Sequence, residues 1–546
     1  MKFTLNKPVI YVARDLERTL GLPVTTKGYY IISNYTAFAN SLAKGHKNVL
    51  LIKNTELLDT RELLVHAKTI NFIKKIKNPQ VLVFKNTLAI EKICQENGWS
   101  LLNPSAGLAS EVEEKITQVQ WLGNLKKYLP PFEVKIANDV KWTGKKFILQ
   151  FNRAHTGSGT ILVENKEQLV EVQTKFPNRE VRITKFISGP MLTNNNVVWG
   201  NKVLCGNISY QITGLKPFTG LPFATVGNDW ALPHKILSST QKKEYAKMAQ
   251  EIGIKMSESG WKGLFGIDVI CDEKTGKLYL IEINARQPAS TSFESILQSI
   301  KSASGTTIFQ AHLLALFGEK NTNDNLVTIN DGAQIVQKIL SEKKPINKKV
   351  LLLNIEEFCK NGLNIVYYEN YKLESDWLRI QSKKGVMEKP GITNSLGQDI
   401  VFFVLANLSG KRLSKRYASD RVAAIITKNT KILLMKRTRF NKEYFVLPGG
   451  TVESGESLLQ ALNREIDEET GLKIIVSKRK PIIIKISGRK EYHFYINSFK
   501  GEAVLGGEEK EKNSMENNYQ LIWEDISNLK NIDFYPASLK DKIFKK

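Results

Sequence analysis

The segment Gly450-Thr-Val-Glu-Ser-Gly-Glu456, followed after seven residues by Arg464-Glu-Ile-Asp-Glu-Glu-Thr-Gly-Leu472, decides how the C-terminal part of this chain folds. Leucine and isoleucine side chains recur at helical spacing, which predicts a helix over residues 457–470. Gly471 follows in the position where glycine commonly ends a helix. On this helix Glu465, Glu468 and Glu469 stand at i, i+3 and i+4 and therefore share one face.

Three carboxylates on one helix face repel one another. A hard divalent cation neutralises such a cluster, and carboxylate oxygens are the ligands that Mg²⁺ and Mn²⁺ prefer. The sequence therefore predicts a metal site on this helix. The alternative interpretation is a solvated acidic helix face.

The segment also matches the Nudix box, Gly-x5-Glu-x7-Arg-Glu-U-x-Glu-Glu-x-Gly-U with U apolar, at every fixed position. Residues 420–546 therefore resemble Nudix hydrolases. The resemblance implies an α/β/α sandwich that cleaves the pyrophosphate of a nucleoside diphosphate derivative with Mg²⁺ or Mn²⁺. It also implies that the three glutamates hold the metal and act in catalysis, that Arg464 orients them, and that Glu456 supports the loop before the helix.

A second cluster of polar side chains lies upstream, on two apolar runs that flank the charged turn 272–276 and predict a β-hairpin. On its second strand Glu282, Asn284 and Arg286 alternate and so face one way, and Asp268 on the first strand joins that face. Two carboxylates and an amide oxygen make a divalent-cation site with room for phosphates, beside an arginine that holds an anion. The alternative is an amphipathic hairpin with a polar outer face.

A loop rich in Gly, Ser and Thr precedes this hairpin in the chain. It covers residues 156–160, between two predicted strands at 147–150 and 161–163. Such a loop folds over phosphates, because its backbone N–H groups point at them. By itself the loop is a weak indication, and it gains weight only together with the hairpin.

In this order the elements resemble the ATP-grasp superfamily over residues 105–320, and residues 1–104 resemble the α/β domain that precedes this fold in many of its members. The resemblance implies an ATP- and Mg²⁺-dependent ligase that phosphorylates a carboxylate and then joins it, through the acyl-phosphate, to an amine or a thiol. The implied metal ligands are Asp268, Glu282 and Asn284, and the implied catalytic arginine is Arg286. The implied nucleotide contacts are Lys115, Gln150, the phosphate loop Thr156, Gly157, Ser158, Gly159 and Thr160, and the adenine hinge Lys185, Phe186 and Ile187.

Two positions depart from the family pattern. Gln150 stands in place of a lysine, and Thr184 stands in place of the usual hinge acid. A missing lysine removes one phosphate contact and weakens ATP binding. The candidates to supply the missing charge are Arg153, Lys202 and Lys216.

The remaining chain is interpreted from strand and helix patterns. Apolar runs alternate with helical stretches over residues 8–100, which predicts a small α/β layer with a parallel sheet. Apolar runs at 350–353, 363–368 and 400–405 predict strands, and Asn194-Asn195-Asn196 predicts a hairpin turn. The fold class is thus α/β and α+β, in several domains. The expected limits are 1–104 for the pre-ATP-grasp α/β domain, 105–320 for the ATP-grasp domain, 321–416 for an extension and linker, and 417–546 for the Nudix domain.

Composition and charge restrict the partners. The 546 residues are 42% hydrophobic and 24% charged, an ordinary globular composition that excludes a largely disordered chain. The net charge of +25 is spread evenly, since residues 420–546 carry +5 of it, so we do not expect a nucleic-acid partner. No apolar run is long enough to span a membrane, the N-terminus has no secretory pattern, and the four cysteines lie far apart. We therefore expect a cytoplasmic protein with no membrane partner and no disulfide framework.

These observations lead to a first hypothesis and two alternatives. The first is a bifunctional enzyme that uses ATP and Mg²⁺ (or Mn²⁺) and acts on small-molecule carboxylate and amine substrates and on a nucleoside diphosphate derivative. In the second, the ATP-grasp module binds ATP without catalysis and regulates the Nudix hydrolase, which the departures at Gln150 and Thr184 favour. The third is a Nudix enzyme associated with nucleic acid, which only the charge favours. The sequence names no substrate and no oligomeric state, and Tyr444, Phe445 and residues 436–439, near the expected Nudix pocket, fit core and surface roles equally well.

Overall fold

The structure, a computed structural model, describes most of the chain. The described residues are 3–152, 159–302, 304–319, 325–340, 348–359, 362–370, 372–408, 420–439, 442–453, 456–486, 489–507, 510 and 517–544. Packing divides the chain into two compact units. The first consists of Met1–Lys344 and Gly362–Thr393, and the second of Pro345–Asn361 and Asn394–Lys546.

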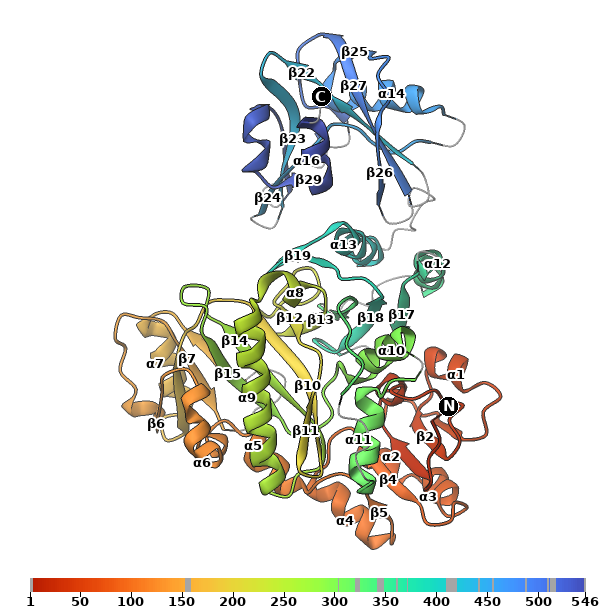
Figure 1. Cartoon of the computed structure of the whole chain (residues 1–546), viewed down its shortest axis with the longest axis vertical. Helices are drawn as coiled ribbons and strands as arrows, with labels where there is room; N and C mark the ends of the chain where they lie inside the picture. The colour runs from red at the N-terminus through yellow and green to blue at the C-terminus, as the bar shows by residue number, and fades with distance from the viewer. Residues whose placement is uncertain are drawn as a thin grey trace. The chain divides into compact units, whose positions relative to one another are not determined.

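A five-stranded parallel sheet opens the first unit, in the order β3-β2-β1-β4-β5 (Figure 1). Its strands are β1 (Val9–Val12), β2 (Tyr29–Asn34), β3 (Val49–Ile52), β4 (Gln80–Val83) and β5 (Ser100–Leu101). Its helices are η1 (Leu16–Thr19), α1 (Ala37–Ala43), α2 (Thr60–Val65), α3 (Ala67–Ile73) and α4 (Leu88–Glu96). Apolar side chains cover both faces, as parallel sheets require. This confirms the predicted small α/β layer.

A nine-stranded antiparallel sheet forms the centre of the first unit, in the order β15-β14-β10-β12-β13-β16-β18-β17 with β11 beside β10. Its strands are β10 (Met191–Trp199), β11 (Lys202–Cys205), β12 (Ser209–Thr213), β13 (Thr225–Asp229), β14 (Gly263–Cys271), β15 (Leu278–Asn284), β16 (Ala333–Lys338), β17 (Asn364–Tyr367) and β18 (Asp376–Ser382). Helix α9 (Ser239–Glu258) runs along one face of this sheet (Figure 1). Helix α11 (Ile308–Phe317) shares one apolar core with β10, β14 and the N-terminal sheet, so it joins the two sheets.

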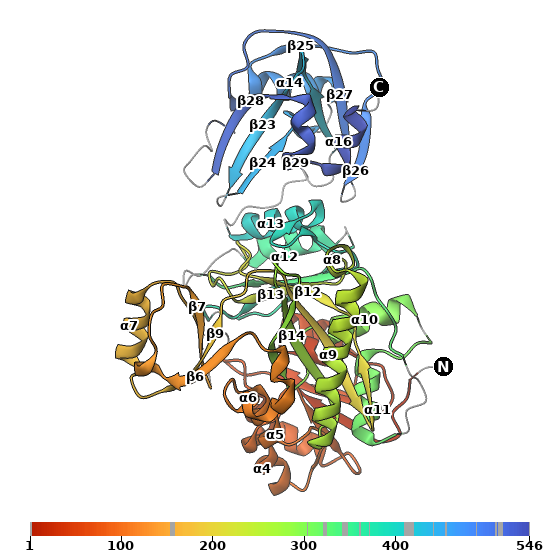
Figure 2. The ribbon, with the colours of Figure 1, turned by 60° about the vertical axis from the view of Figure 1, so that its left-hand side comes forward.

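A smaller antiparallel sheet in the order β6-β9-β7-β8 carries the region around Gln150. Its elements are β6 (Phe132–Ile136), β7 (Phe147–Phe151), β8 (Thr160–Val163), β9 (Glu180–Lys185) and α7 (Lys166–Lys175). Figure 2 shows α7 on the outer side of this sheet, where Leu149, Val181 and Leu169 form its core. Because side chains alternate along a strand, Gln150 and Arg182 lie on the opposite face. The other elements of the first unit are α5 (Ala106–Glu113), α6 (Thr117–Leu122), η2 (Gly123–Tyr128), η3 (Ala137–Asp139), α8 (Leu232–Ile236), α10 (Thr291–Lys301), β19 (Met387–Lys389) and β20 (Ile392–Thr393).

The C-terminal part of the second unit places two sheets between two helices. The sheets have the orders β21-β27-β25, with β26 beside β27, and β22-β23-β24-β29, with β28 beside β23. Helix α14 (Leu458–Thr470) packs on one side and α16 (Ala537–Phe544) on the other, which is the predicted α/β/α sandwich. The strands and the short helix are β21 (Arg421–Ile425), β22 (Thr427–Lys428), β23 (Lys431–Arg439), β24 (Lys442–Val446), β25 (Lys473–Val476), β26 (Ile482–Ile486), β27 (Arg489–Lys500), β28 (Asn517–Asp525), β29 (Phe534–Tyr535) and η5 (Ile526–Lys530).

Two predicted strands are helices in the structure. The run 350–353 lies in α12 (Lys348–Cys359), and the run 400–405 lies in α13 (Ser395–Leu408). The rings of Phe358 and Phe403 stack at 4.4 Å between these helices. A short apolar run is compatible with a buried helix and with a strand. Only a longer stretch of sequence, in which buried residues recur every three or four positions, identifies the helix.

The predicted turn at residues 194–196 is also wrong. Asn194, Asn195 and Asn196 are buried in the middle of β10. Asn194 and Asn196 hydrogen-bond to each other at 2.7 and 2.8 Å, and Asn195 contacts Ser290 on the other face. The three amides lie in a strand, although their local sequence favours a turn, because partners in the folded structure complete their hydrogen bonds.

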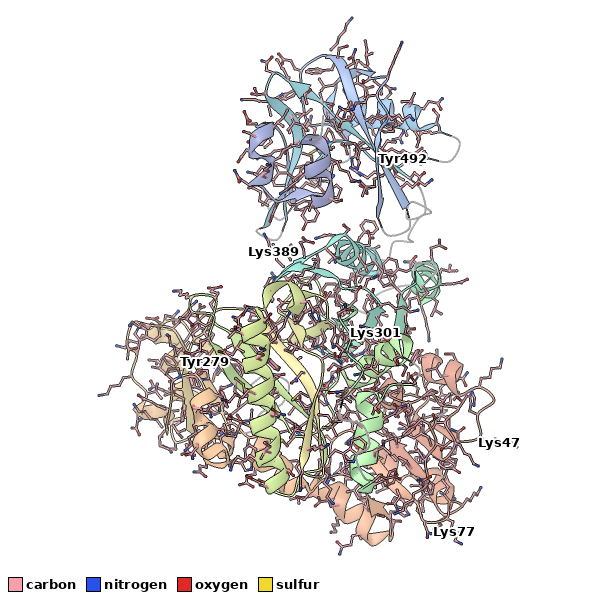
Figure 3. The ribbon with its side chains drawn as sticks, viewed as in Figure 1. Lys47, Lys77, Tyr279, Lys301, Lys389 and Tyr492 are labelled. Carbon is pink, nitrogen blue, oxygen red and sulfur yellow. The ribbon has the colours of Figure 1, made fainter. Side chains whose placement is uncertain are left out.

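Lys47, Lys77 and Lys301, which are labelled in Figure 3, are exposed and come from separate segments of the first unit. Among the described residues, no helix combines the length and the apolar character that crossing a membrane requires. All four cysteines are free thiols.

Candidate functional site

The β14–β15 hairpin carries the metal ligands that the sequence predicts for the ATP site. Asp268 and Glu282 lie directly opposite each other, and the register shifts immediately after Asp268. Such a bulge re-aims the side chains around it. Asn284 Nδ2 donates to Asp268 Oδ2 at 3.3 Å. The structure therefore brings the three predicted ligands to one end of the hairpin.

Two cations flank these side chains. The Lys115 Nζ, just after α5, lies 2.9 Å from Glu282 Oε1. Arg286 Nη2 donates to Asn284 Oδ1 at 2.7 Å, and its Nε lies 3.2 Å from Glu113 Oε1. Tertiary contact thus joins Lys115, Glu282, Asn284 and Arg286, which the sequence places up to 171 positions apart.

Burial and neighbouring charges both act on the two carboxylates. Burial first, and then the Glu282 carboxylate, raise the pKa of Asp268. Burial alone would raise the pKa of Glu282 too, but Lys115, Arg286 and Arg182 together hold it below its usual value. Two facing carboxylates and an amide supply the oxygen donors that Mg²⁺ prefers, so the residue types present fit this ion once the Asn284 amide turns its oxygen, which here accepts from Arg286, toward the carboxylates.

Gln150 lies beside a cation that the sequence reasoning did not consider. Arg182 is its cross-strand partner on β9, and the Arg182 side chain is only 2% exposed. Arg182 Nε and Nη2 donate to Gln150 Oε1 at 3.0 and 2.7 Å. The signal for it was present in the sequence, because a charged residue alternates with apolar ones along the strand 180–185.

The predicted phosphate loop is described only in part. Thr156, Gly157 and Ser158 lie outside the described residues. The Gly159 carbonyl accepts from the Phe151 N–H at 3.0 Å, and the Thr160 hydroxyl accepts from Gln150 Nε2 at 3.3 Å. The described end of the loop is therefore tied to the strand that carries Gln150.

The predicted adenine hinge follows the end of β9. The Lys185 N–H donates to the Pro131 carbonyl at 3.0 Å, and Lys185 is paired with Phe147 on β7. Ile187 is buried, and the Lys146 ammonium lies 4.3 Å from the centre of the Phe186 ring. The hinge and Arg182 thus lie on one strand and its extension.

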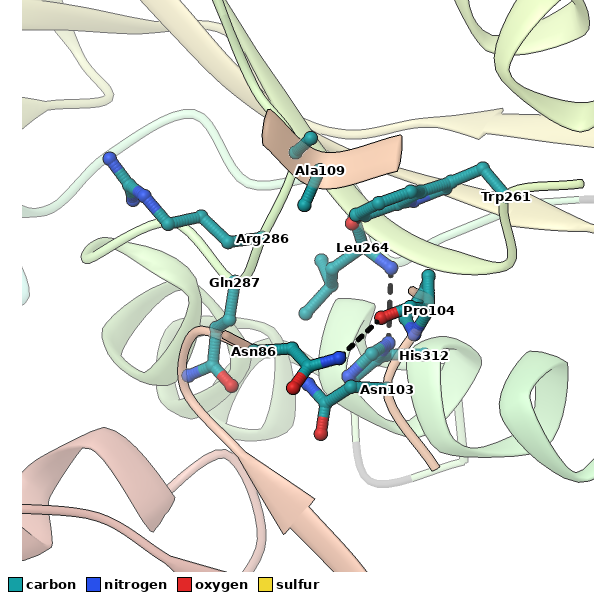
Figure 4. A pocket seen from close by; sticks show the side chains of 10 residues that line it. Asn86, Asn103, Pro104, Ala109, Trp261, Leu264, Arg286, Gln287 and His312 are labelled. Carbon is teal, nitrogen blue, oxygen red and sulfur yellow. Dashed lines mark hydrogen bonds between the residues drawn. The ribbon is translucent and has the colours of Figure 1, made fainter. Parts of the chain in front are cut away.

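A small cavity lies where the N-terminal layer meets the hairpin end (Figure 4). Its volume is about 10 Å³, which is room for roughly one water molecule. Asn86 Oδ1 is buried with no hydrogen-bond partner among the described residues, and a buried water satisfies such a group. In Figure 4 the guanidinium of Arg286 points away from the cavity. The cavity therefore fits a structural water and is too small for a substrate.

The second candidate site lies on α14, where Arg464 connects the acidic side chains. Arg464 Nε and Nη2 donate to the two carboxylate oxygens of Glu456 at 2.7 and 3.0 Å. Arg464 Nη1 donates to Glu465 Oε1 at 3.0 Å and to Glu468 Oε2 at 3.3 Å. The hydrogen bonds from Arg464 lower the pKa of Glu456 to about 2. Glu456 thus fixes Arg464, and Arg464 in turn faces two of the predicted metal ligands.

The loop before α14 contacts the other face of this cluster. The Gly449 N–H donates to Glu469 Oε2 at 2.8 Å, and Glu469 is buried. A Cβ added at Gly450 would lie 2.1 Å from the Glu465 carboxyl carbon. Only glycine at this position leaves room for that carboxylate, whose pKa is raised by burial.

Metal binding at α14 requires a side chain to turn. Among the described residues, no group of three His, Cys, Asp or Glu side chains is arranged to hold a metal ion. On α14 the reason is visible, since Arg464 and Gly449 hold the carboxylates of Glu465, Glu468 and Glu469. The Glu468 side chain is 54% exposed and its contact with Arg464 is 3.3 Å long, so a change of rotamer costs little and the donor set still fits Mg²⁺ or Mn²⁺.

A ladder of aromatic and basic side chains lies on the α14 face of the second sheet. Arg437 is paired across the strands with both Tyr444 and Tyr519, and its guanidinium lies 5.1 Å from the centre of the Tyr519 ring. Tyr444 meets Tyr535 edge to face at 6.0 Å. Phe445 points the other way into the apolar core, which decides one of the open interpretations.

Comparison with known proteins identifies the same two regions. The NUDIX domain family matches residues 418–535, and the ATP-grasp domain family matches residues 112–290. The Nudix hydrolase YvcI of Bacillus subtilis is 31% identical over 121 residues, 21% of this chain and 70% of that protein. The ADP-ribose pyrophosphatase of Methanocaldococcus jannaschii is 46% identical over 81 residues, 12% of this chain and 48% of that protein.

Two solved structures resemble a large part of this chain. The N5-carboxyaminoimidazole synthetase from Staphylococcus aureus complexed with ADP is 13% identical with a TM-score of 0.50, over 74% of this chain and 99% of that one. The carboxyaminoimidazole ribonucleotide synthase from Aspergillus clavatus complexed with ATP is 14% identical with a TM-score of 0.50, over 74% and 99%. At such identities the likeness shows the fold alone.

Proposed function

Because the chain belongs to the Nudix family in its C-terminal part and carries an ATP-grasp domain before it, we propose that it is a bifunctional enzyme. The first activity joins a small-molecule carboxylate to an amine or a thiol at the expense of ATP. The second hydrolyses the pyrophosphate of a nucleoside diphosphate derivative. The proposed limits of the parts are 1–104, 105–320, 321–416 and 417–546.

The contact that supports the ligase most directly is the ion pair of Lys115 and Glu282 at 2.9 Å. It brings a predicted nucleotide contact against a predicted metal ligand, next to Arg286. Asp268, Glu282 and Asn284 would hold Mg²⁺, which when bound neutralises the charge of the transferred phosphoryl group. Arg286 would hold the carboxylate that accepts the phosphoryl group, because a guanidinium grips two oxygens at once.

The test of the ligase measures ADP release from ATP and Mg²⁺ with pooled amino acids and small carboxylates. The full chain carries Glu468→Gln and Glu469→Gln, so that the Nudix site does not consume the nucleotides. We expect acceptor-dependent ADP release that Glu282→Gln abolishes. Saturable ATP binding without ADP release from any acceptor would favour the regulatory alternative, in which this module only binds ATP.

For the Nudix domain, we propose that Glu465, Glu468 and Glu469 hold the metal and that Arg464 orients them. The bound metal would polarise the attacked phosphate and its water. Arg437, Tyr444 and Tyr519 lie on the same face of the sheet as α14, where aromatic rings favour a nucleoside part of the substrate. ADP-ribose is the first compound to assay, because the name of one relative gives it as a substrate.

This activity is tested by hydrolysis of ADP-ribose and other nucleoside diphosphate derivatives with Mg²⁺ and with Mn²⁺. We expect Glu465→Gln to abolish the hydrolysis of whichever compound is cleaved, and Tyr519→Ala to raise its KM more than it lowers kcat. Hydrolysis that survives Glu465→Gln undiminished would overturn the assignment of α14.

A further inference from the structure

Arg182 is a buried cation in the middle of the small sheet. It is 2% exposed and lies on the face opposite α7, since the neighbouring Val181 and Ile183 pack into the α7 core. Taking a guanidinium out of water is costly unless a partner compensates its charge. Burial accordingly lowers the pKa of Arg182 to about 10.

Its hydrogen-bond partners orient the guanidinium without neutralising it. Gln150 Oε1 accepts from Nε and Nη2, and Gln118 Oε1 accepts from Nη1 at 3.4 Å. Each amide is fixed by its own donor, since Gln150 Nε2 donates to Thr160 Oγ1 and Gln118 Nε2 donates to the Val112 carbonyl. Both amide oxygens are therefore held toward the guanidinium, and both partners are uncharged.

Arg182 has no carboxylate of its own. Among the described residues, Glu282 is the carboxylate whose charge acts on Arg182. Glu282 is already paired with Lys115 at 2.9 Å, while Arg286 contacts Glu113 at 3.2 Å. No described carboxylate forms an ion pair with Arg182 itself, so its guanidinium is held only by neutral amides. An anion bound beside it would compensate this buried charge.

We propose that Arg182 binds the polyphosphate of ATP, as a guanidinium held in place by the Gln150 and Gln118 amides. The inference rests on the proposed ATP site. It goes beyond that site because it assigns the phosphate contact to β9. The residue that faces Arg182 on β7 is Gln150, which carries no charge. Arg182 contacts the nucleotide, and the two glutamines act as positioning residues for it.

The experiment measures binding of MgATP and of adenosine to the full chain by calorimetry, with four variants. Arg182→Met removes the charge. Arg182→Met with Gln150→Lys moves a cation across the β7–β9 pair to the facing position. Arg179→Met is the matched control, because Arg179 is exposed three positions earlier and packs over the Phe151 and Phe176 rings. Arg182→Lys keeps the charge but loses the planar fork.

We expect Arg182→Met to weaken MgATP binding about 10- to 100-fold, the value of a charged hydrogen bond, and to leave adenosine binding unchanged. The double variant should recover most of the MgATP affinity, Arg182→Lys should lie between, and Arg179→Met should match the wild type. This split between ATP and adenosine is one that a purely structural role would not produce.

Three results would overturn the inference. In the first, Arg182→Met binds MgATP as the wild type does. In the second, the single and double variants lose adenosine binding together, which makes Arg182 structural. In the third, adenosine binding persists in the double variant without recovery of MgATP. A wild-type chain that binds neither MgATP nor adenosine would instead refute the ATP site itself.

Discussion

The carboxylates of α14 and those of the β14–β15 hairpin are both predicted metal ligands, yet their surroundings differ. On α14 one arginine, Arg464, contacts Glu456, Glu465 and Glu468, all within thirteen residues of sequence. At the hairpin, Glu282 is surrounded by Lys115, Arg182 and Arg286, which come from three separate segments.

The difference teaches where each site takes its charge partners from. Exposure does not separate the two sites, since the Glu465 and Glu282 side chains are 15% and 36% exposed. On α14 the partners come from the helix and the loop before it, whereas at the hairpin the fold brings in cations from distant segments. A change at the first site should therefore stay local, whereas the second depends on long-range packing.

The largest effect is expected from Asp268→Asn, which removes one of the facing carboxylates. ADP release should fall about 1,000-fold, the upper end of what one electrostatic group contributes to catalysis. Nudix hydrolysis by the same variant should not change, because α14 belongs to the other compact unit. Both activities are measured on one preparation, and a parallel loss of both would contradict two separate sites.

The buried polar network behind the hairpin should make the first unit sensitive to pH. Burial raises the pKa of Glu294 from its ordinary 4.5 to about 7, although Asn195 and Asn207 donate hydrogen bonds to it. The folded form therefore holds a proton that the unfolded form releases. Stability from this group is complete below pH 4.5 and is lost as the pH rises through 7, by about 3 kcal/mol.

Amide hydrogen exchange in β10, followed from pH 5 to pH 8 and corrected for the intrinsic exchange rates, measures this effect. Glu294→Gln, the neutral isostere, should flatten the profile of opening free energy in β10. Exchange in β21 and β27 of the second unit is the internal control. Equal slopes in the wild type and in Glu294→Gln would show that the pKa of Glu294 is ordinary.

Gly450→Ala tests how tightly the α14 site is interlocked with its loop. The added Cβ meets the end of the Glu465 side chain, which gives way more easily than backbone, so the fold should survive. Displacing that carboxylate should lower hydrolysis about 100-fold, as an ångström-scale misplacement does. Gly107→Ala, where the Cβ meets nothing within 4 Å, is the control. Full hydrolytic activity in Gly450→Ala would argue against Glu465 as a ligand.

The smallest effect is expected from Arg464→Lys. Lysine keeps the charge near Glu465 and Glu468 but cannot grip both oxygens of Glu456. Hydrolysis should fall about 10-fold at limiting Mg²⁺, and less at saturating Mg²⁺, as is usual when a residue that orients metal ligands is altered. A titration of activity against Mg²⁺ measures it, and an unchanged Mg²⁺ dependence would remove the orienting role.

A long periodic pattern with capping residues predicts its element well, whereas short apolar or amide runs do not. The sequence predicts a helix over 457–470, and α14 covers Leu458–Thr470, with Ser457 as its N-cap and Gly471 in the left-handed region at its C-cap. The run 400–405 was predicted as a strand because its period is too short to distinguish strand from helix. Asn194-Asn195-Asn196 was predicted as a turn because amides favour turns unless distant partners bind them.

The sequence by itself determined the Nudix membership, the presence of an ATP-grasp domain, the acidic face of α14 and the alternation of Glu282, Asn284 and Arg286. Each of these depends on spacing along the chain. Only the tertiary structure decided that Lys115 meets Glu282, that Arg182 lies against Gln150, and that the cavity beside Arg286 fits a single water. These are contacts between segments whose approach depends on how sheets pack and which strands pair. Short sequence patterns do not predict which segments approach each other, because this depends on the free energy of the whole packed core.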